Sequence, residues 1–299
     1  MENRISVIIP VFNGAHTLRE CVRSVFNQSF MPFEVIVVDN NSTDDTPKIC
    51  KEFQNTFADL HYVFEAQRSR GAARNAGVRA ARGSIIAMTD VDCVVPRDWL
   101  EKITEPIRSG KETVTVGSQT DVIETYWSRN MQRMHDLLGR RLTLRDYVHY
   151  IDTKNFAIAA PLMKTALFDP SFKELEDEEF GLRLRPYAFF RFLPAVKVDH
   201  RHAQTFLQTA RSAFLRSFWS MQLYHKFKNA RDINRVLIVP EMTTGQFLRS
   251  LFYFDLPALK ELGLSHLPFF VVYDLSWKIG RFVGYFNPQK EVVQLGKVR

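Results

Sequence analysis

The chain has 299 residues, of which 45% are hydrophobic and 24% are charged. This is the composition of a globular protein, which excludes a disordered or fibrous chain, and the length allows one large domain with an appendage. The formal net charge of +7 favours anionic partners such as nucleotides, phosphorylated lipids or an acidic membrane surface.

The cysteines and the N-terminus indicate a cellular compartment. Cys21, Cys50 and Cys93 are odd in number and lack metal-ligand spacing, which fits a reducing environment. The N-terminus enters a predicted strand almost at once, without a signal-peptide pattern. The sequence contains no run of about 18 uncharged apolar residues, so no transmembrane helix is predicted. We therefore expect a protein of the cytoplasm.

Apolar strands alternate with helices through the first hundred residues. The predicted strands are 5–12, 34–39, 62–64 and 85–88. Three helices are predicted between them. The first carries apolar residues at helical spacing from Leu18 to Phe26, the second begins at Thr46-Pro47, and the third spans 68–83. This order is typical of an α/β fold with a mostly parallel sheet that helices cover on both faces.

The alternation weakens after residue 96. A helix is predicted from Pro96 to about residue 110, and another over 124–141. Further strands are predicted at 113–116, 155–158 and 191–198. From about residue 203 the chain becomes helical and rich in aromatic residues. We therefore expect an α/β domain over 1–202 and a helical C-terminal region over 203–299.

Carboxylates stand where the predicted strands end. Asp39 closes the second strand, and Asp90 and Asp92 follow the strand at 85–88. Because ligands bind at the C-terminal edge of such sheets, we expect these side chains, on adjacent strands, to line one crevice. Asp39 can bind a base or ribose there, and the Asp90–Asp92 pair can hold a divalent cation that in turn holds a phosphate. An isolated Asp-x-Asp is more often a surface turn, so this interpretation depends on its context.

The segment 70–77 has two interpretations. It adds positive charge and small residues that allow close backbone approach to a ligand. The same glycines and alanines would also serve simple helix packing.

Five segments, in order, resemble the family 2 glycosyltransferases with the GT-A fold. They are SVIIPVFN at 6–13, VVDNNSTD at 37–44, GAARNAG at 71–77, DVD at 90–92 and ED at 176–177. The resemblance covers roughly the first two-thirds of the chain. It implies a nucleotide-sugar donor, a divalent metal (Mg²⁺ or Mn²⁺) and inversion at the anomeric carbon.

The resemblance also implies where the donor would bind. The nucleotide-sugar half would be about 1–117 and the acceptor half about 118–202. Asp39 would accept a hydrogen bond from the base, which suits uridine and also guanosine. Arg74 would lie near the diphosphate. The residues that would border the nucleoside are Pro10, Val11 and Phe12.

The remaining roles implied by the resemblance concern the metal and the acceptor. Asp90 would face the ribose, and Asp92 would coordinate the metal. Asp177 would be the general base, with Glu176 close to the acceptor. His200, at the end of a strand, would be a further metal ligand or contact the diphosphate.

The acidic run at 174–179 leaves the identity of the base open. Such a run is usually a solvated helix face. It also departs from the family pattern, because Leu175 stands where glycine is common and Glu179-Phe180 where Asp-Leu is common.

The C-terminal region also has two interpretations. Its aromatic residues could pack onto the catalytic domain as a second core, or its helices could lie in a membrane interface. Basic residues there would favour peripheral contact with anionic lipids on the cytoplasmic face. These basic residues are Lys226, Lys228, Arg231, Arg249 and Lys278.

The predicted function is that of an inverting, metal-dependent glycosyltransferase. It would move a sugar from a UDP-sugar, or a GDP-sugar, to a hydroxyl of a glycan or lipid-linked acceptor in cell-surface polysaccharide assembly. One alternative is a sugar nucleotidyltransferase, which would need a Gly-rich, Lys-containing loop that residues 11–14 do not supply. Another is a non-catalytic subunit that binds glycan or nucleotide. Nucleic-acid binding would explain the charge but not the ordered carboxylates.

Overall fold

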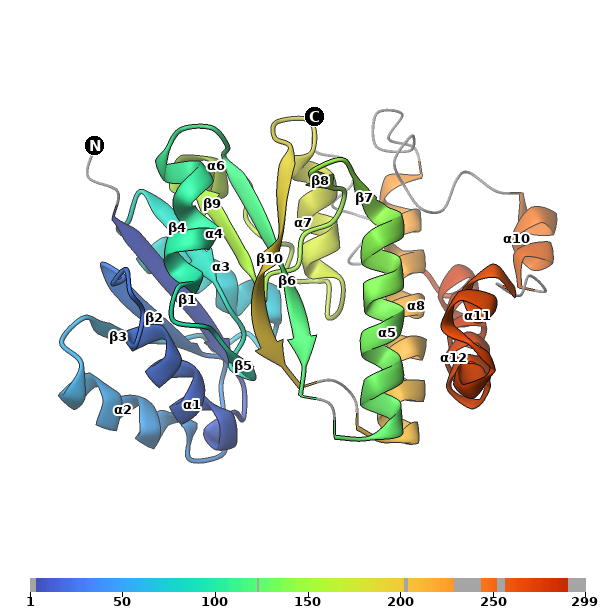
Figure 1. Cartoon of the computed structure of the whole chain (residues 1–299), viewed down its shortest axis with the longest axis horizontal. Helices are drawn as coiled ribbons and strands as arrows, with labels where there is room; N and C mark the ends of the chain where they lie inside the picture. The colour runs from blue at the N-terminus through green and yellow to red at the C-terminus, as the bar shows by residue number, and fades with distance from the viewer. Residues whose placement is uncertain (1–3, 123, 202–203, 229–242, 252–255, 290–299) are drawn as a thin grey trace. The chain divides into compact units, whose positions relative to one another are not determined.

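The computed structural model describes residues 4–122, 124–201, 204–228, 243–251 and 256–289. Contacts divide the chain into two compact units (Figure 1). The first comprises Met1–Thr120 and Leu142–Arg201, and the second comprises Asp121–Arg141 and His202–Arg299. The second unit thus combines residues from 202 onward with residues 121–141, which the sequence placed in the first domain.

The first unit is built on one mixed sheet, for which the described residues provide ten strands. The strand order is β3-β2-β1-β4-β9-β6-β10-β8-β7, and β5 pairs with β10. The strands are β1 (Ile5–Val11), β2 (Glu34–Asp39), β3 (Leu60–Phe64), β4 (Ile85–Met88), β5 (Cys93–Val94), β6 (Val114–Asp121), β7 (Thr143–Leu144), β8 (Tyr147–Val148), β9 (Phe156–Ala159) and β10 (Phe190–His200).

The four strands β1 to β4 are parallel, and antiparallel strands extend the sheet beyond β4. The predicted α/β class is thus confirmed. The expectation that Asp39 and Asp90 end adjacent strands is wrong, because β1 pairs with both β2 and β4 and lies between them. The crossovers put the first strand at the centre of the parallel part, an arrangement that chain order does not reveal.

Helices cover both faces of this sheet. They are α1 (Ala15–Phe26), α2 (Thr46–Thr56), α3 (Arg70–Ala80), α4 (Trp99–Arg108), α6 (Ala160–Thr165) and α7 (Glu176–Leu184). Successive residues of β1 belong to different cores, since Val7 and Ile9 pack in one apolar cluster and Ile8 in the other. A strand buried on both faces needs a continuous apolar run, which the β1 sequence supplies.

The second unit is helical. Its elements are α5 (Tyr126–Leu142), α8 (Phe206–Phe227), α10 (Thr244–Ser250), α11 (Leu256–Leu262), the 3₁₀ helix η1 (Leu264–His266) and α12 (Leu267–Phe286). Its aromatic residues form a core of its own, in which Phe269 and Phe270 pack with Met131 and Met134 of α5. No helix among the described residues is long and apolar enough to cross a membrane.

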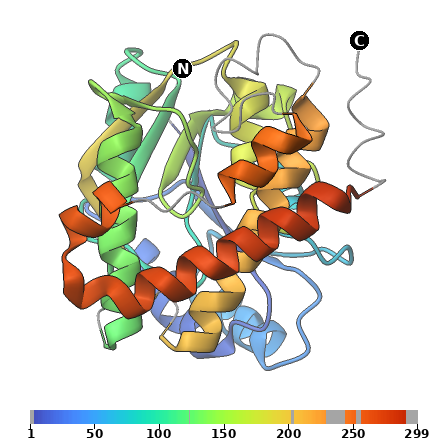
Figure 2. The same ribbon diagram turned by 90° about the vertical axis from the view of Figure 1, so that its right-hand side faces the viewer.

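Glycines bring α12 close to α8, which it crosses in Figure 2. A Cβ at Gly280 would lie 2.3 Å from the Phe214 carbonyl oxygen, and one at Gly284 would lie 2.7 Å from that of Phe218. Only glycine fits this approach, so one face of α12 is occupied by α8.

The three cysteines, Cys21, Cys50 and Cys93, are buried free thiols.

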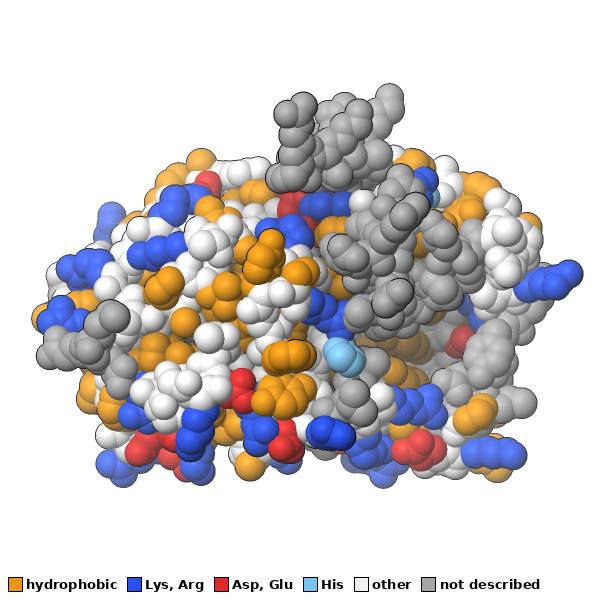
Figure 3. Space-filling view, turned by 90° about the horizontal axis from the view of Figure 1, so that it is seen from above, with side chains coloured by type: hydrophobic (Ala, Val, Ile, Leu, Met, Phe, Trp, Pro, Cys, Tyr) orange, Lys and Arg blue, Asp and Glu red, His pale blue; other side chains and the backbone are white. Residues whose placement is uncertain are grey.

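On the face shown in Figure 3, Lys and Arg side chains are spread among exposed hydrophobic ones.

Candidate active site

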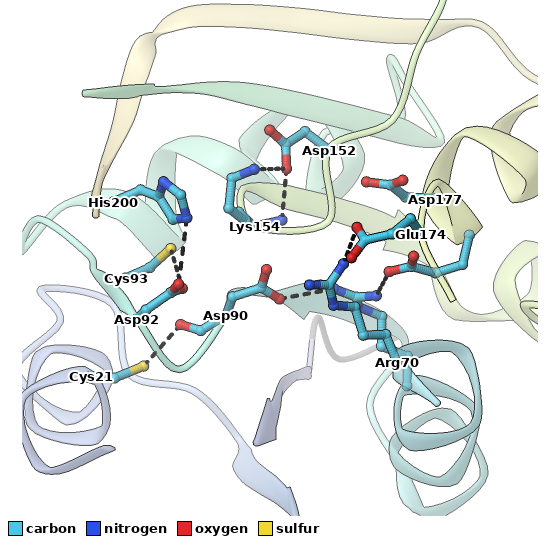
Figure 4. Close-up of polar contacts among 12 residues, drawn as sticks. Cys21, Arg70, Asp90, Asp92, Cys93, Asp152, Lys154, Glu174, Asp177 and His200 are labelled. Carbon is cyan, nitrogen blue, oxygen red and sulfur yellow. Dashed lines mark hydrogen bonds and ion pairs between the residues drawn. The ribbon is translucent and has the colours of Figure 1, made fainter. Parts of the chain in front are cut away.

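The site forms where β4 ends, in the first unit (Figure 4). Asp90 and Asp92 follow directly after Met88, the last residue of β4. Because β9 runs antiparallel to β4 and pairs Phe156 with Met88, the residues that precede β9 lie beside those that follow β4. This pairing brings Lys154 to the carboxylates.

A second antiparallel pairing brings His200 to Asp92. His200 at the end of β10 pairs with Cys93 in β5, the residue after Asp92. His200 Nε2 lies 3.5 Å from Asp92 Oδ2, and the Asp92 side chain is 41% exposed. Partial burial works against ionisation of Asp92, but the hydrogen bond and charge of His200, with the charge of Lys154, outweigh it and hold the pKa of Asp92 below its usual range.

The donor set at Asp92 and His200 suits a divalent cation. A carboxylate oxygen and an imidazole nitrogen are ligands that Mn²⁺ accepts, and Mg²⁺ usually keeps several waters and takes substrate phosphates. Within the described ranges, no group of three or more His, Cys, Asp and Glu side chains could hold a metal by itself. Asp92 and His200 could therefore supply two ligands to such an ion.

Lys154 and Asp152 were not predicted from the sequence. The Lys154 ammonium lies 3.0 Å from Asp152 Oδ1, which also accepts a hydrogen bond from the Lys154 backbone N–H. Burial disfavours the charged lysine, but the charges of Asp152 and Asp90 outweigh it and raise the pKa of Lys154 above its usual range. In the sequence, only their position just before the strand predicted at 155–158 could have indicated a place in the site. That position places them there only once the pairing of this strand with β4 is known.

Arg74 is buried behind Asp90 rather than exposed to a ligand. Its side chain is 2% exposed, Nη2 donates to Asp90 Oδ1 at 2.9 Å, and Nη1 donates to Glu176 Oε1. Small residues let α3 pack closely against β1, since a Cβ at Gly77 would lie 2.5 Å from Ile8 Cγ2. The glycines of segment 70–77 therefore serve helix packing, and the packing places a guanidinium between two acidic groups.

Most of the acidic run is engaged by arginine. Glu174 pairs with Arg70 at 2.6 Å, and Glu179 pairs with Arg183 at 2.7 Å. Glu176 is 3% exposed against Arg74, and Glu179 is fully buried. A solvated helix face is thus wrong for these two residues.

Asp177 differs from its neighbours in the run. It is half-buried in the first turn of α7 and accepts a hydrogen bond from the Glu178 backbone N–H at 2.9 Å. Figure 4 shows its carboxylate on the same side of the site as Asp152 and Lys154. Burial, followed by the charges of Glu176, Asp152 and Glu178, raises the pKa of Asp177 to about 7.

The backbone before Asp177 is strained. Leu175, immediately before α7, has φ 60° and ψ 24°, which is left-handed, and its side chain is buried. A non-glycine residue in this conformation costs roughly 1–2 kcal/mol. The conformation gives a physical reason why glycine is common at this position, and burial of the leucine side chain offsets part of the cost.

A second group of side chains lies at the ends of β1 and β2. Asp39 is fully buried, and its carboxylate accepts hydrogen bonds from Ser42 N–H at 2.9 Å and from the Tyr62 hydroxyl at 2.8 Å. Phe12 is 41% exposed, with the Arg68 guanidinium 4.0 Å from its ring centroid. Of the other two residues predicted to border a nucleoside, Val11 is buried and Pro10 half-buried.

These observations define a class of protein with a mixed α/β sheet and an acidic site at its parallel strand ends. The family model described as glycosyl transferase family 2 matches residues 6–169, which is more than half of the chain. The chain belongs to this family, and the resemblance seen in the five sequence segments is confirmed.

Curated relatives match part of the chain. Glycosyltransferase AglE of Haloferax volcanii is 37% identical over 148 residues, which are 46% of this chain and 48% of that protein. The minor teichoic acid biosynthesis protein GgaA of Bacillus subtilis is 30% identical over 190 residues, which are 58% of this chain and 42% of that protein. The chain spans about half the length of these relatives or less.

Solved structures share the fold. A mannosyltransferase from Pyrobaculum calidifontis, PcManGT, in complex with GDP-Man and Mn²⁺ aligns with a TM-score of 0.68 at 18% identity, over 95% of this chain and 87% of that one. S. aureus TarS 1–349 in complex with UDP aligns with a TM-score of 0.53 at 16% identity, over 95% and 90%. The predicted GT-A fold is thereby confirmed.

Proposed function

We propose that the protein is an inverting, metal-dependent glycosyltransferase. It moves a sugar from a nucleotide-sugar to a hydroxyl of a glycan or lipid-linked acceptor in cell-surface polysaccharide assembly. The observation that carries the proposal is the position of Asp177, at the start of α7 in the site that also holds Asp92 and Lys154 (Figure 4). Burial and negative neighbours support this role, because they raise the pKa of Asp177 to about 7. A base poised near the working pH is what removal of a proton from a hydroxyl requires.

Asp177 is the general base of the proposed reaction. Its carboxylate takes the proton of the acceptor hydroxyl while that oxygen forms a bond to the anomeric carbon. The bond from the anomeric carbon to the donor phosphate breaks, and the nucleoside diphosphate leaves with the electron pair. Attack and departure on opposite faces of the carbon invert its configuration. The base therefore belongs on a segment separate from the diphosphate site, as α7 is from the end of β4.

The leaving diphosphate is held at Asp92, His200 and Lys154. When Mg²⁺ or Mn²⁺ is bound, it supplies a Lewis acid that neutralises the negative charge of the leaving group. Lys154 adds a fixed positive charge in the same region, and Asp152 orients its ammonium. This lysine shares with the metal the task of stabilising the diphosphate.

Arg74 and Glu176 position the site rather than touch the substrates. Arg74 fixes the Asp90 carboxylate, which faces the ribose in this proposal, through the 2.9 Å bond. Glu176 holds Arg74 from the other side and adds the negative charge that helps keep the pKa of Asp177 high. The resemblance implied that Arg74 lies near the diphosphate and Glu176 close to the acceptor; this proposal gives both residues indirect roles.

Asp39 and Phe12 form the proposed base site. Asp39 keeps lone pairs beyond the two that Ser42 and Tyr62 occupy, and in this proposal it accepts from the ring N–H of uridine or guanosine. Because its carboxylate is fully buried, this contact requires the surrounding side chains to move when the base binds. Phe12, which is partly exposed and carries the Arg68 guanidinium over its ring, offers an aromatic surface beside the base. We favour a UDP-sugar as donor, and a GDP-sugar is the second choice.

A thermal-shift panel tests the proposal. The full chain is mixed with UDP-, GDP- and dTDP-sugars, with and without Mn²⁺, and the stabilising donor is then incubated with candidate acceptors. We expect a metal-dependent shift with one nucleotide and release of its nucleoside diphosphate. Binding without release under any condition would favour the non-catalytic subunit, and release of pyrophosphate from a nucleoside triphosphate and a sugar phosphate would favour a nucleotidyltransferase.

A further inference from the structure

One face of α12 is exposed and entirely apolar. Every residue of this helix with an exposed side chain is hydrophobic or proline. The exposed fractions of the large ones range from 37% for Val271 and Val283 to 56% for Ile279. We call this set the α12 face; its members are Leu267, Pro268, Val271, Leu275, Ile279, Phe282, Val283 and Phe286.

The charges of α12 lie away from this face. Asp274 and Lys278 pair at 2.6 Å with side chains only 18% and 20% exposed, and Arg281 is half-buried. Gly280 and Gly284 occupy the side that contacts α8. A helix at a water-exposed surface normally carries its charges outward, so this distribution is the reverse of that expected for a solvated helix.

The dimensions of the face suit a membrane surface. Members recur every three or four residues from 267 to 286, so they follow one side of the helix for about 30 Å. The helix is not long and apolar enough to cross a bilayer. An apolar helix face at the surface of a domain can lie in the plane of the interface with its apolar side among the lipid chains, while the opposite side of the helix stays packed on the protein.

The charge of the chain is concentrated in the same unit. Residues 121–141 and 202–299 contain 17 Lys and Arg against 9 Asp and Glu, a net charge of +8. The rest of the chain contains 23 basic and 24 acidic residues, a net charge of −1. The unit that bears the α12 face thus carries all of the net positive charge, and basic residues near a membrane favour anionic lipids.

We propose that the α12 face inserts into the surface layer of a membrane that contains anionic lipids. The apolar face supplies the burial, and the charge of the second unit selects anionic over zwitterionic headgroups. The inference stands on the second unit alone and does not depend on the reaction proposed for the first.

Vesicle flotation tests this proposal. The full chain is mixed with vesicles of phosphatidylcholine alone, or with one third phosphatidylglycerol, at low and high salt. The variant Ile279→Glu/Phe282→Glu places two charges on the α12 face. The matched control is Tyr187→Glu/Phe189→Glu, which changes two large aromatic side chains of the first unit that are even more exposed, at 77% and 79%.

We expect the wild type and the control to float with the anionic vesicles, less so at high salt, and the α12 variant to bind about tenfold more weakly or worse, because charged side chains do not enter the lipid chains. Failure of the wild type to float, or equal flotation of the α12 variant, would overturn the proposal. The proposal would also be overturned if light scattering showed that the wild type is a dimer and that the α12 variant is a monomer, because the α12 face would then be a dimer interface. Equal binding to both vesicles would overturn the selection of anionic lipid. Nucleotide-sugar thermal shifts, measured on the same three proteins, report separately on the proposed function.

Discussion

Asp177→Asn removes the proposed base and leaves the shape of the side chain nearly unchanged. Loss of the proton acceptor should lower kcat by about 10²–10⁴-fold, while the thermal shift with nucleotide-sugar persists. In the wild type, kcat/KM should rise with pH through about 7, because only the ionised carboxylate accepts the proton. This acid limb should be absent from the residual activity of the variant.

The same substitution should stabilise the fold. The native carboxyl binds its proton more tightly than the unfolded one, whose pKa is 3.8, so the stability of the wild type falls as pH rises from about 4 to 7. Three pKa units correspond to about 4 kcal/mol, and partial exposure reduces this to about 1–3 kcal/mol. Asparagine carries no such penalty, so the gain in unfolding free energy should be larger at pH 8 than at pH 5.

Two assays measure these effects. Nucleoside diphosphate release gives the pH profile, and urea denaturation followed by circular dichroism gives the stability at each pH. Glu178→Gln is the matched control, because it keeps the base but removes a charge that raises the pKa of Asp177, so its acid limb should move to lower pH. Undiminished transfer by Asp177→Asn, or a stability gain that is equal at both pH values, would refute the reasoning.

Other predictions concern the charged and polar side chains around the site. Arg74→Met leaves Asp90 and Glu176 without their arginine partner and should lower the unfolding free energy by about 3–5 kcal/mol in urea denaturation. Arg70→Met, which breaks an exposed pair, should cost less than about 1 kcal/mol, and equal costs would contradict the burial argument. Lys154→Met should weaken nucleoside diphosphate binding in calorimetry by about tenfold, the equivalent of one charge-assisted hydrogen bond, and unchanged affinity would make this lysine purely structural. Tyr62→Phe removes one hydrogen bond to Asp39 and should cost about 1 kcal/mol of stability; no measurable loss would show that water replaces the hydroxyl.

Local sequence predicted the elements of the sheet well. The strands at 34–39 and 85–88 were predicted with the bounds that the structure has, because short β-branched runs between polar turns leave little alternative. The carboxylates at their ends followed from the same pattern, since parallel strands present their C-terminal ends to one edge.

Pairing between distant segments was not predictable. The strand at 155–158 was expected, but its antiparallel register with β4, which brings Lys154 to Asp90, depends on contacts some 70 residues apart. Helix 124–141 was likewise expected, but its packing with the C-terminal helices was not. An amphipathic pattern says which face is buried and not which partner buries it.

The sequence by itself therefore determined the fold class, the family and the edge of the sheet at which the acidic residues gather, because these depend on local periodicity and on ordered motifs. The tertiary structure decided what each acidic residue does. Glu176 and Asp177 are neighbours of the same chemical type, yet one is paired with a buried arginine and the other has its pKa raised by burial and by negative neighbours. Proton affinity depends on the charges and solvent around a carboxyl group, and those are set only when the chain has folded.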